Sequence, residues 1–323
     1  MELTKQRKEL LDATMKQIKE RKILAAKYRN QSLEHQRRRF EAANRFRRPY
    51  FEKLLELLKV ENKQLEELQR KDLESLRKFN EKQYKQLIKD LKSVSKTYDN
   101  RIKNLLDYRK NYNESHGNPV HVFCGLQADL IDKYINFGGP LPDGVISQPA
   151  LCENIVRFQW DAPEWECYDA GFKALFFWDD PPAGFIGATA EIGIIGAYLL
   201  EAGYACYGGG QAQLQGDAKL HLSQGGANPL YISEEIRFID EMATGPGWNE
   251  GSIGFPGPIP MGVGTVNVSI PQNVRIVAGT PLLGTVEVEF FACSGANSRV
   301  LVDFNSEDHL KLNFTALLMT VES

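Results

Sequence analysis

Glycine is confined to one part of this chain. All 27 glycines lie at or after Gly117, and the 116 residues before it contain a single proline, Pro49. A glycine-free segment rich in Lys, Glu, Gln and Leu favours helix, whereas the glycine, proline and β-branched residues that follow favour tight turns and extended strands. The sequence therefore predicts an α+β protein with separate domains: a helical segment over residues 1–115 and an all-β domain over residues 116–323.

Charge divides the chain at the same place. The formal net charge is −3, but residues 1–115 carry about +13 and the remainder about −16. Opposite charges attract at short range, and salt screens the attraction beyond roughly 10 Å. We therefore expect the two parts to attract each other, or to attract neighbouring copies in an assembly.

Pro49 is the expected site of a kink or break in the helical part, because proline lacks a backbone N–H and crowds the preceding turn. Two arrangements are open. The segments on either side of Pro49 form one long kinked helix, which the lack of a Gly or Asn turn there favours, or they fold back on each other as a helical hairpin.

A thin apolar stripe runs along the second half of the helical part. Its spacings of three and four residues are typical of a coiled coil or a narrow bundle face. Such a stripe needs partner helices, either from a folded-back segment or from other copies of the chain. We expect a helical stalk in a homo-oligomer, with a trimer favoured, and the predicted seam consists of Tyr84, Leu87, Leu91, Val94, Tyr98, Ile102 and Leu105.

A basic segment with aromatic neighbours precedes Pro49, where Phe40 and Phe46 lie among six arginines. This combination suits acidic residues of a neighbouring subunit, an anionic membrane surface, or the phosphates and bases of nucleic acid. We favour a solvated face or an acidic partner first, a membrane second and nucleic acid last. The basic patch consists of Arg37, Arg38, Arg39, Arg45, Arg47 and Arg48.

The residues after 116 alternate between apolar and polar with the period of two that half-buried strands have. In one such run we expect Val286, Val288 and Phe290 to face a core and Glu287 and Glu289 to lie on the opposite face. About ten to twelve strands separated by glycine and proline turns predict an antiparallel β-sandwich of the jelly-roll type.

A helical stalk followed by a β-sandwich head resembles, in plan, the trimeric fibre heads of viruses and phages and the tumour-necrosis-factor type of jelly roll. The resemblance implies trimers that recognise a surface.

Aromatic residues alternate with carboxylates between positions 160 and 180. Rings that stack on sugar CH groups, beside carboxylates that accept hydroxyl hydrogen bonds or bind a cation, are typical of a ligand-binding loop. The alternative is a loop whose aromatics close one end of the core while its acids face water. The candidate ligand-binding residues are Trp160, Asp161, Glu164, Trp165, Glu166, Tyr168, Asp169, Trp178, Asp179 and Asp180.

Cysteine and histidine show no catalytic or metal-binding spacing. The five cysteines all follow residue 116, and we expect them to be mostly reduced and buried, with one or two disulfides as the alternative. His221 lies between two leucines of a strand and is expected to face solvent. We expect no metal and no cofactor.

The sequence shows neither a signal peptide nor a segment apolar enough to span a membrane, so we expect a cytoplasmic protein or one released without a signal peptide. The predicted function is non-enzymatic: a self-associating structural or recognition protein whose β-sandwich head binds a protein or glycan surface. One alternative is a pore-forming toxin whose amphipathic helices insert into a membrane. The other is a binder of anionic lipid or nucleic acid through the basic patch.

Overall fold

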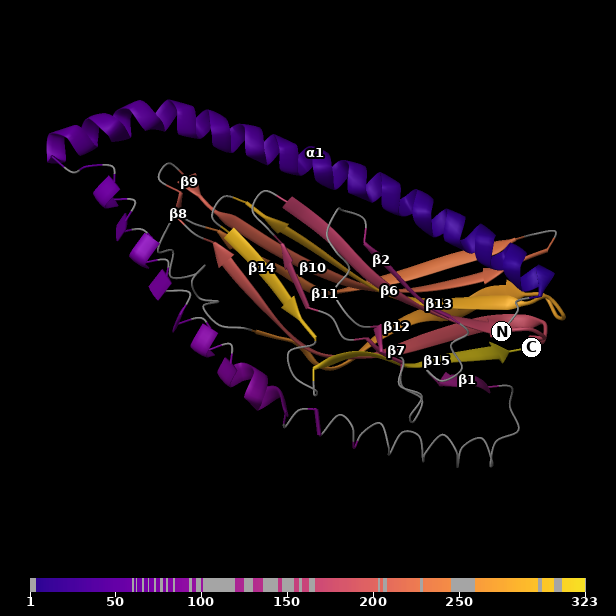
Figure 1. Ribbon diagram of the computed structural model, residues 1–323. Helices are drawn as coiled ribbons and strands as arrows, with labels where there is room; N and C mark the ends of the chain where they lie inside the picture. Colours follow the sequence, from indigo (N-terminus) through magenta and orange to yellow (C-terminus); the bar gives the residue numbers. More distant parts are fainter. Residues whose placement is uncertain are drawn as a thin grey trace.

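The computed structural model describes residues 4–59, parts of 61–100, and residues 120–322 except for 125–129, 136–144, 147–153, 157–158, 163–165, 203, 206–207, 227–228, 245–258, 296–297 and 305–309. Two antiparallel sheets form a sandwich, and the long helix α1 (Lys5–Leu58) lies along it (Figure 1).

Helix α1 is continuous over its 54 residues. Thr4 caps its start by accepting a hydrogen bond from the backbone N–H of Arg7, as expected of an N-cap threonine. The sequence predicts a kink or a break near Pro49; the helix is not broken there, in agreement with the favoured arrangement in which one helix continues past this residue. It ends at Leu58, where Lys59 adopts a left-handed conformation (φ 54°) and donates its N–H to the carbonyl of Glu56.

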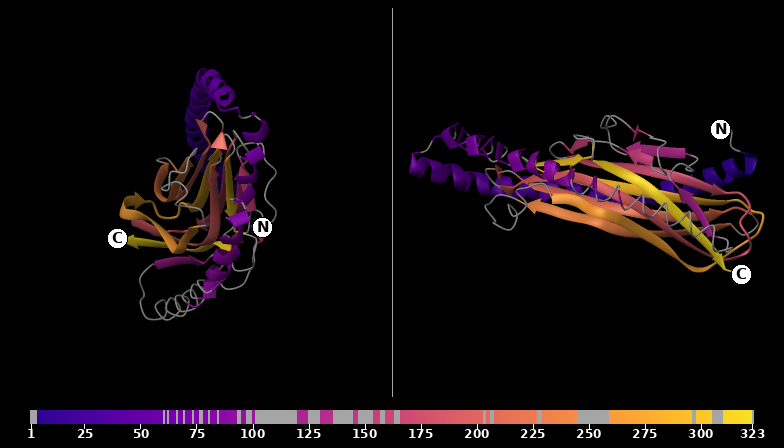
Figure 2. Two further views of the ribbon diagram at one scale, coloured as in Figure 1. Left: turned by 90° about the vertical axis from the view of Figure 1, so that its left-hand side faces the viewer. Right: turned by 90° about the horizontal axis from the view of Figure 1, so that it is seen from below.

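After Lys59 the chain turns back. Helical residues between 63 and 100 run along the opposite side of the sandwich from α1, so that the strands lie between the two helical segments (Figures 1 and 2). The reversal follows Lys59 and not Pro49, so the segments on either side of Pro49 do not form the hairpin that was the alternative, and the two helical segments are separated by the sandwich. No helix among the described residues is both long and apolar enough to cross a membrane.

The smaller sheet has the strand order β11-β10-β13-β6-β2. All of its neighbouring strands are antiparallel. Its strands are β2 (Leu130–Ile135), β6 (Glu166–Trp178), β10 (Gln211–Gln224), β11 (Leu230–Thr244) and β13 (Leu282–Ser294).

The larger sheet is built around β7, which pairs with β12 on one side and with β15 and β14 on the other. Strand β15 also pairs with β1 and β4, β4 pairs with β3, and β14 pairs with β5; a short separate pair is formed by β8 and β9. These strands are β1 (Val120–Cys124), β3 (Val145–Ile146), β4 (Asn154–Val156), β5 (Gln159–Ala162), β7 (Gly184–Ala202), β8 (Tyr204–Ala205), β9 (Gly208–Gly209), β12 (Ile259–Ile276), β14 (Ser298–Asp303) and β15 (Lys311–Glu322).

The core fills the space between the two sheets. Val286, Val288 and Phe290 on β13 are buried there, as the alternation in the sequence predicts. At Gly284 a side chain would collide with Leu317 and Met319 of β15, so glycine lets the two sheets approach each other at this point.

Each helical segment packs on the outer face of one sheet. Leu10 of α1 forms a small apolar cluster with Leu175, Phe177 and Leu283 of the smaller sheet. On the other side, a second cluster contains Ile88, Leu91, Ile195, Ala197 and Leu310, and it covers the outer face of the larger sheet.

One disulfide joins Cys167 on β6 to Cys293 on β13, which lie opposite each other in the strand register. The expectation of mostly reduced cysteines is wrong for this pair. The antiparallel two-sheet sandwich with N-terminal helix is confirmed, whereas the coiled coil, the jelly-roll type and the domain boundary at residues 115–116 stay predictions.

Candidate functional site beneath helix α1

The outer face of the smaller sheet is polar along its centre. Strand β10 directs Leu220 and Leu222 into the core, and the alternate residues Lys219, His221 and Ser223 therefore point outwards. In the strand register Lys219 lies opposite Glu287 of β13, His221 opposite Thr285 and Ser223 opposite Leu283, while Glu289 lies opposite Asp217. Glu287 and Glu289 are thus close to Lys219 and His221 on the same face.

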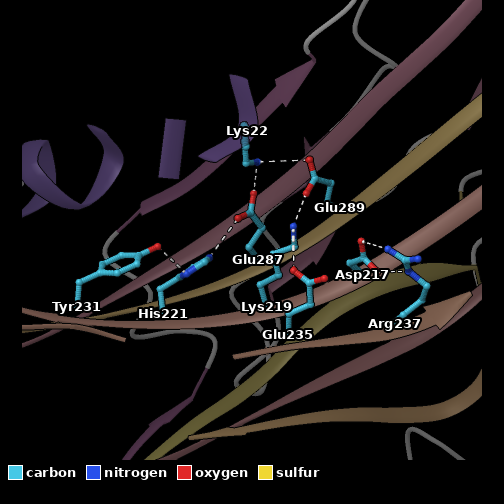
Figure 3. A network of polar contacts seen from close by, with 9 residues as sticks. All are labelled: Lys22, Asp217, Lys219, His221, Tyr231, Glu235, Arg237, Glu287 and Glu289. Carbon is cyan, nitrogen blue, oxygen red and sulfur yellow. Dashed lines mark hydrogen bonds and ion pairs between the residues drawn. The ribbon is translucent and has the colours of Figure 1, made fainter. Parts of the chain in front are cut away.

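Helix α1 adds a lysine to this face (Figure 3). The Lys22 ammonium pairs with a carboxylate oxygen of Glu287 and lies 3.8 Å from an oxygen of Glu289. Lys219 completes the group, with its Nζ 2.8 Å from Glu289 and 3.4 Å from Glu235. Lys22, Lys219, Glu235, Glu287 and Glu289 are termed the charge cluster below. The cluster binds α1 to the sheet, and its pair Lys22–Glu287 joins residues that are 265 positions apart in the sequence.

His221 and Tyr231 extend the charge cluster towards the N-terminal part of α1. His221 Nε2 lies 3.3 Å from the second oxygen of Glu287, and its Nδ1 lies 3.0 Å from the Tyr231 hydroxyl. The guanidinium of Arg21 in turn covers the Tyr231 ring at 4.9 Å. His221 is therefore buried under α1, and the expectation that it faces solvent is wrong because the helix covers this face of the strand.

Burial and charge act in opposite directions on these groups. Burial alone raises the pKa of Glu287, but the hydrogen bond from His221 and the charges of Lys22 and Lys173 outweigh it, so that the pKa is well below its ordinary value. The pKa of Glu289 is also lowered, because the charges of Lys22 and Lys219 outweigh its burial. For Lys22 burial prevails over the attraction of both carboxylates and lowers the pKa to about 8.

A pocket of about 480 Å³ opens next to the charge cluster, between the N-terminal part of α1 and two turns of the sandwich. This size lies within the range of small-molecule sites. The helix contributes exposed amides at Gln6 and Gln17, and the sheet contributes Ser223 and Tyr231. Apolar surface comes from Leu10, Ala13, Pro229, Leu230 and Pro281.

Ser223 is the notable residue of this pocket. Its side chain is only 3% exposed, and its hydroxyl has no hydrogen-bond partner among the described residues. A buried hydroxyl without a partner is costly to stability, so such groups are uncommon in folded proteins. Ser223 is one of the residues that line the pocket, which makes its hydroxyl a candidate contact for a bound molecule.

The neighbouring Gln224 shapes the pocket. Its amide nitrogen donates to the carbonyls of Val277 (2.8 Å) and Thr280 (2.9 Å), and its amide oxygen accepts from the N–H of Val277 (2.9 Å). These bonds hold together the end of β10 and the β12–β13 turn, both of which contribute residues to the pocket lining.

The residues that the sequence predicts to bind a ligand are distributed over the sandwich. Trp160 and Asp161 lie on β5 of the larger sheet, whereas Glu166, Tyr168 and Asp169 lie at the start of β6 in the smaller sheet. Glu164 and Trp165 are outside the described residues.

Trp178, Asp179 and Asp180 lie at the other end of β6, roughly 40 Å from Glu166 at 3.3 Å per residue. Trp178 is buried in the core. Asp179 is exposed and accepts a hydrogen bond of 2.6 Å from Nε of Arg7, which lowers its pKa. Asp180 is exposed. Ligand binding by this set as a whole stays a prediction.

The basic patch lies on the part of α1 beyond the charge cluster, where Arg37, Arg38 and Arg48 each pair with a glutamate four residues away. Of the predicted seam, Leu87 is half-buried and Leu91 is buried, both against the chain's own larger sheet. The other seam residues, Tyr84, Val94, Tyr98, Ile102 and Leu105, lie outside the described residues.

The pocket and the charge cluster were not found from sequence. The signal was present in part, because β10 carries Lys219, His221 and Ser223 at every second position, and Glu287 and Glu289 have the same spacing on β13. Only the strand register and the position of α1 bring the two sets together. In the part of the chain that the structure describes, no group of three or more His, Cys, Asp or Glu side chains is placed to hold a metal ion.

Structurally, the protein is an antiparallel β-sandwich in which a helix covers a polar face of one sheet and a pocket lies at one end of that contact. No family model matches the sequence, and no curated protein matches it significantly.

Solved structures that match include the carbohydrate-binding module TmCBM61 in complex with β-1,4-galactotriose (10% identity, covering 65% of this chain and 94% of that one, TM-score 0.21). A family 11 carbohydrate-binding module from Clostridium thermocellum, in complex with a β-1,3-1,4-mixed-linked tetrasaccharide, also matches (7% identity, 64% of this chain and 98% of that one, TM-score 0.20). A third match is the enzymatically active domain of tailspike protein 4 of bacteriophage CBA120 (10% identity, 63% of this chain but 19% of that one, TM-score 0.21). At these TM-scores the likenesses carry no argument, and the site is interpreted from its own geometry.

Proposed function

We propose that the protein is a non-enzymatic recognition protein that binds a neutral glycan in the pocket beneath the N-terminal part of α1. The observation that carries the proposal is the buried Ser223 hydroxyl, which lines this pocket and has no partner among the described residues. A sugar hydroxyl is able both to donate to this oxygen and to accept from it.

The remaining lining fits the same class of ligand. The amides of Gln6 and Gln17 each offer a donor and an acceptor, and the apolar surface of Leu230 and Pro229 suits the CH groups of a sugar ring. Among the described residues that line the pocket, Glu9 is the single carboxylate. A mainly uncharged lining favours a neutral ligand over a charged one.

A non-enzymatic role is consistent with the state of the acidic groups. Both oxygens of Glu287 are engaged, one by Lys22 and the other by His221, in the attachment of α1. These groups stabilise the helix–sheet contact, and the pocket beside them offers hydrogen bonds. Trimerisation through the predicted seam is not part of the proposal, because Leu87 and Leu91 pack within the chain.

The proposal is tested by screening the full chain on an array of neutral oligosaccharides and measuring the affinity of any hit by calorimetry. Ser223→Ala and Gln17→Ala should each weaken binding about three- to tenfold, as expected for the loss of one hydrogen bond. Lys19→Ala is the matched control, since Lys19 is an exposed residue of α1 that does not line the pocket.

Stability separates a binding role of Ser223 from a structural one. Ser223→Ala removes a buried group that has no described partner, so the free energy of unfolding should stay the same or rise while binding weakens. The absence of any bound oligosaccharide, or binding that both pocket variants leave intact, would reject the pocket as a glycan site.

A further inference from the structure

A second surface, at the far end of α1, is exposed and apolar. Phe46, Tyr50, Leu54 and Leu57 are between 49% and 74% exposed, and their spacings of four, four and three residues align them along one side of the helix. The rings of Phe46 and Tyr50 are in contact, with centroids 5.8 Å apart. These four residues are termed the tip stripe.

The tip stripe is located where the chain reverses. The C-terminal part of α1 projects beyond the strands, and the chain turns back after the left-handed Lys59 (Figures 1 and 2). Leu58, which is 61% exposed, lies beside this turn. The projecting end of α1 is able to reach another surface without any rearrangement of the sandwich.

The charge around the tip stripe is strongly positive. Residues 34–59 carry eight basic and four acidic side chains. Three of the arginines pair with glutamates at exposed i,i+4 positions, where such pairs contribute little and are easily exchanged for another anion. Arg38 and Arg45 border a shallow groove with Phe46, so that cationic and aromatic groups lie side by side.

We propose that the tip stripe and the arginines beside it form a docking site for an anionic lipid surface. Helices that lie in a membrane interface combine Phe, Tyr and Leu on one face with Lys and Arg beside them. The apolar side chains would enter the boundary between headgroups and acyl chains, and the arginines would bind lipid phosphates. Contact between the tips of two copies is less favourable, because it would bring two regions of excess positive charge together.

This attachment is peripheral. The described helices contain no segment apolar enough to span a membrane, and the tip stripe covers about three turns of one helix face. The expected affinity for the membrane therefore has two contributions. Insertion of the apolar side chains is not weakened by salt, whereas the attraction of the arginines to anionic lipid is weakened by salt.

The test is flotation of the full chain with vesicles of phosphatidylcholine, with and without phosphatidylserine, at low and at high salt. The protein should float with the phosphatidylserine vesicles at low salt and much less with the neutral ones. Phe46→Ser combined with Leu57→Ser should reduce binding at least about tenfold, because two apolar side chains no longer enter the lipid. Arg38→Gln combined with Arg45→Gln should weaken binding mainly at low salt.

Val277→Ser is the matched control, because Val277 is an apolar residue of the sandwich with a comparable exposure of 62%; this variant should float like the unmodified protein. Failure to bind phosphatidylserine vesicles, or binding that the tip variants leave unchanged, overturns the proposal. Light scattering tests the alternative that a second copy of the chain occupies the tip stripe. If the protein does not bind vesicles but self-associates, and if Phe46→Ser combined with Leu57→Ser makes it monomeric, the tip stripe is a contact between copies and the proposal is overturned.

Discussion

Glu287 is the residue on which the attachment of α1 depends most. It is fully buried, and it receives both the ammonium of Lys22 from the helix and Nε2 of His221 from the neighbouring strand. Removing one partner of a buried ion pair is costly, because the other charges remain buried without compensation.

Glu287→Gln should therefore lower the free energy of unfolding by about 3 kcal/mol or more, measured by urea denaturation. Glu234→Gln is the control, since Glu234 lies exposed on β11, and its effect should stay within about 0.5 kcal/mol. Equal stability of the two variants would show that the buried pair contributes no net stabilisation.

The same carboxylates predict how stability depends on pH. The pKa values of Glu287 and Glu289 are both below the ordinary value of 4.5 in the folded protein. Near pH 4.5 the unfolded chain takes up protons that the folded chain does not, so the free energy of unfolding falls as the pH falls. Their contribution is present above that pH and is lost below it.

Urea denaturation at a series of pH values around 4.5 should show this loss, with a slope of up to about 1.4 kcal/mol per pH unit for each carboxylate. Glu287→Gln combined with Glu289→Gln should flatten the slope, although the variant is less stable at neutral pH. An unchanged slope in the double variant would assign the acid dependence to other groups.

At the scale of elements, two strands of the smaller sheet are joined covalently. The disulfide between Cys167 on β6 and Cys293 on β13 closes a sequence separation of 126 residues that includes β7, β10, β11 and β12. A cross-link over so long a segment restricts the unfolded chain strongly, and native disulfides of this kind typically contribute several kcal/mol.

Cys293→Ser should lower the free energy of unfolding by about 2–5 kcal/mol. A reducing agent should lower the stability of the unmodified protein to a similar level and leave the variant unchanged, which separates loss of the disulfide from loss of the cysteine side chain. A variant as stable as the oxidised protein would contradict the expectation.

At the scale of the whole molecule, the helical part and the sandwich depend on each other. Removal of residues 1–59 would expose the apolar surface of Leu175, Phe177 and Leu283 and would leave Glu287 without Lys22. We expect the shortened chain to bind the dye ANS and to lose at least about 3 kcal/mol of stability, since each apolar side chain contributes about 1.5–3 kcal/mol when buried.

Dye fluorescence and thermal unfolding of the full and shortened chains measure this dependence. Lys19→Ala in the full chain is the control for a change on the exposed side of α1, and it should not increase dye binding. A shortened chain with the stability of the full chain would mean that α1 is an appendage and not part of the folded unit.

The local patterns of the sequence determined the elements. The absence of glycine before Gly117 predicts helix, and residues 5–58 are one helix. The alternation at Val286, Val288 and Phe290 predicts a strand with one face in a core, and these residues lie there in β13. Helix propensity and hydrophobic periodicity depend on residues close together in the sequence, so they can be recognised without knowledge of the tertiary structure.

The charges of the two parts predict mutual attraction, and the structure shows it within one chain, at Lys22 with Glu287 and Arg7 with Asp179. The sequence alone did not determine which surfaces meet. Glu287 and His221 have the pattern of solvent-facing strand residues and become buried only because α1 lies over them. Likewise, the pocket at Ser223 requires a helix and two turns from distant parts of the sequence. Burial on the outer face of a sheet depends on what covers it, and that is decided by contacts across hundreds of residues that no local pattern encodes.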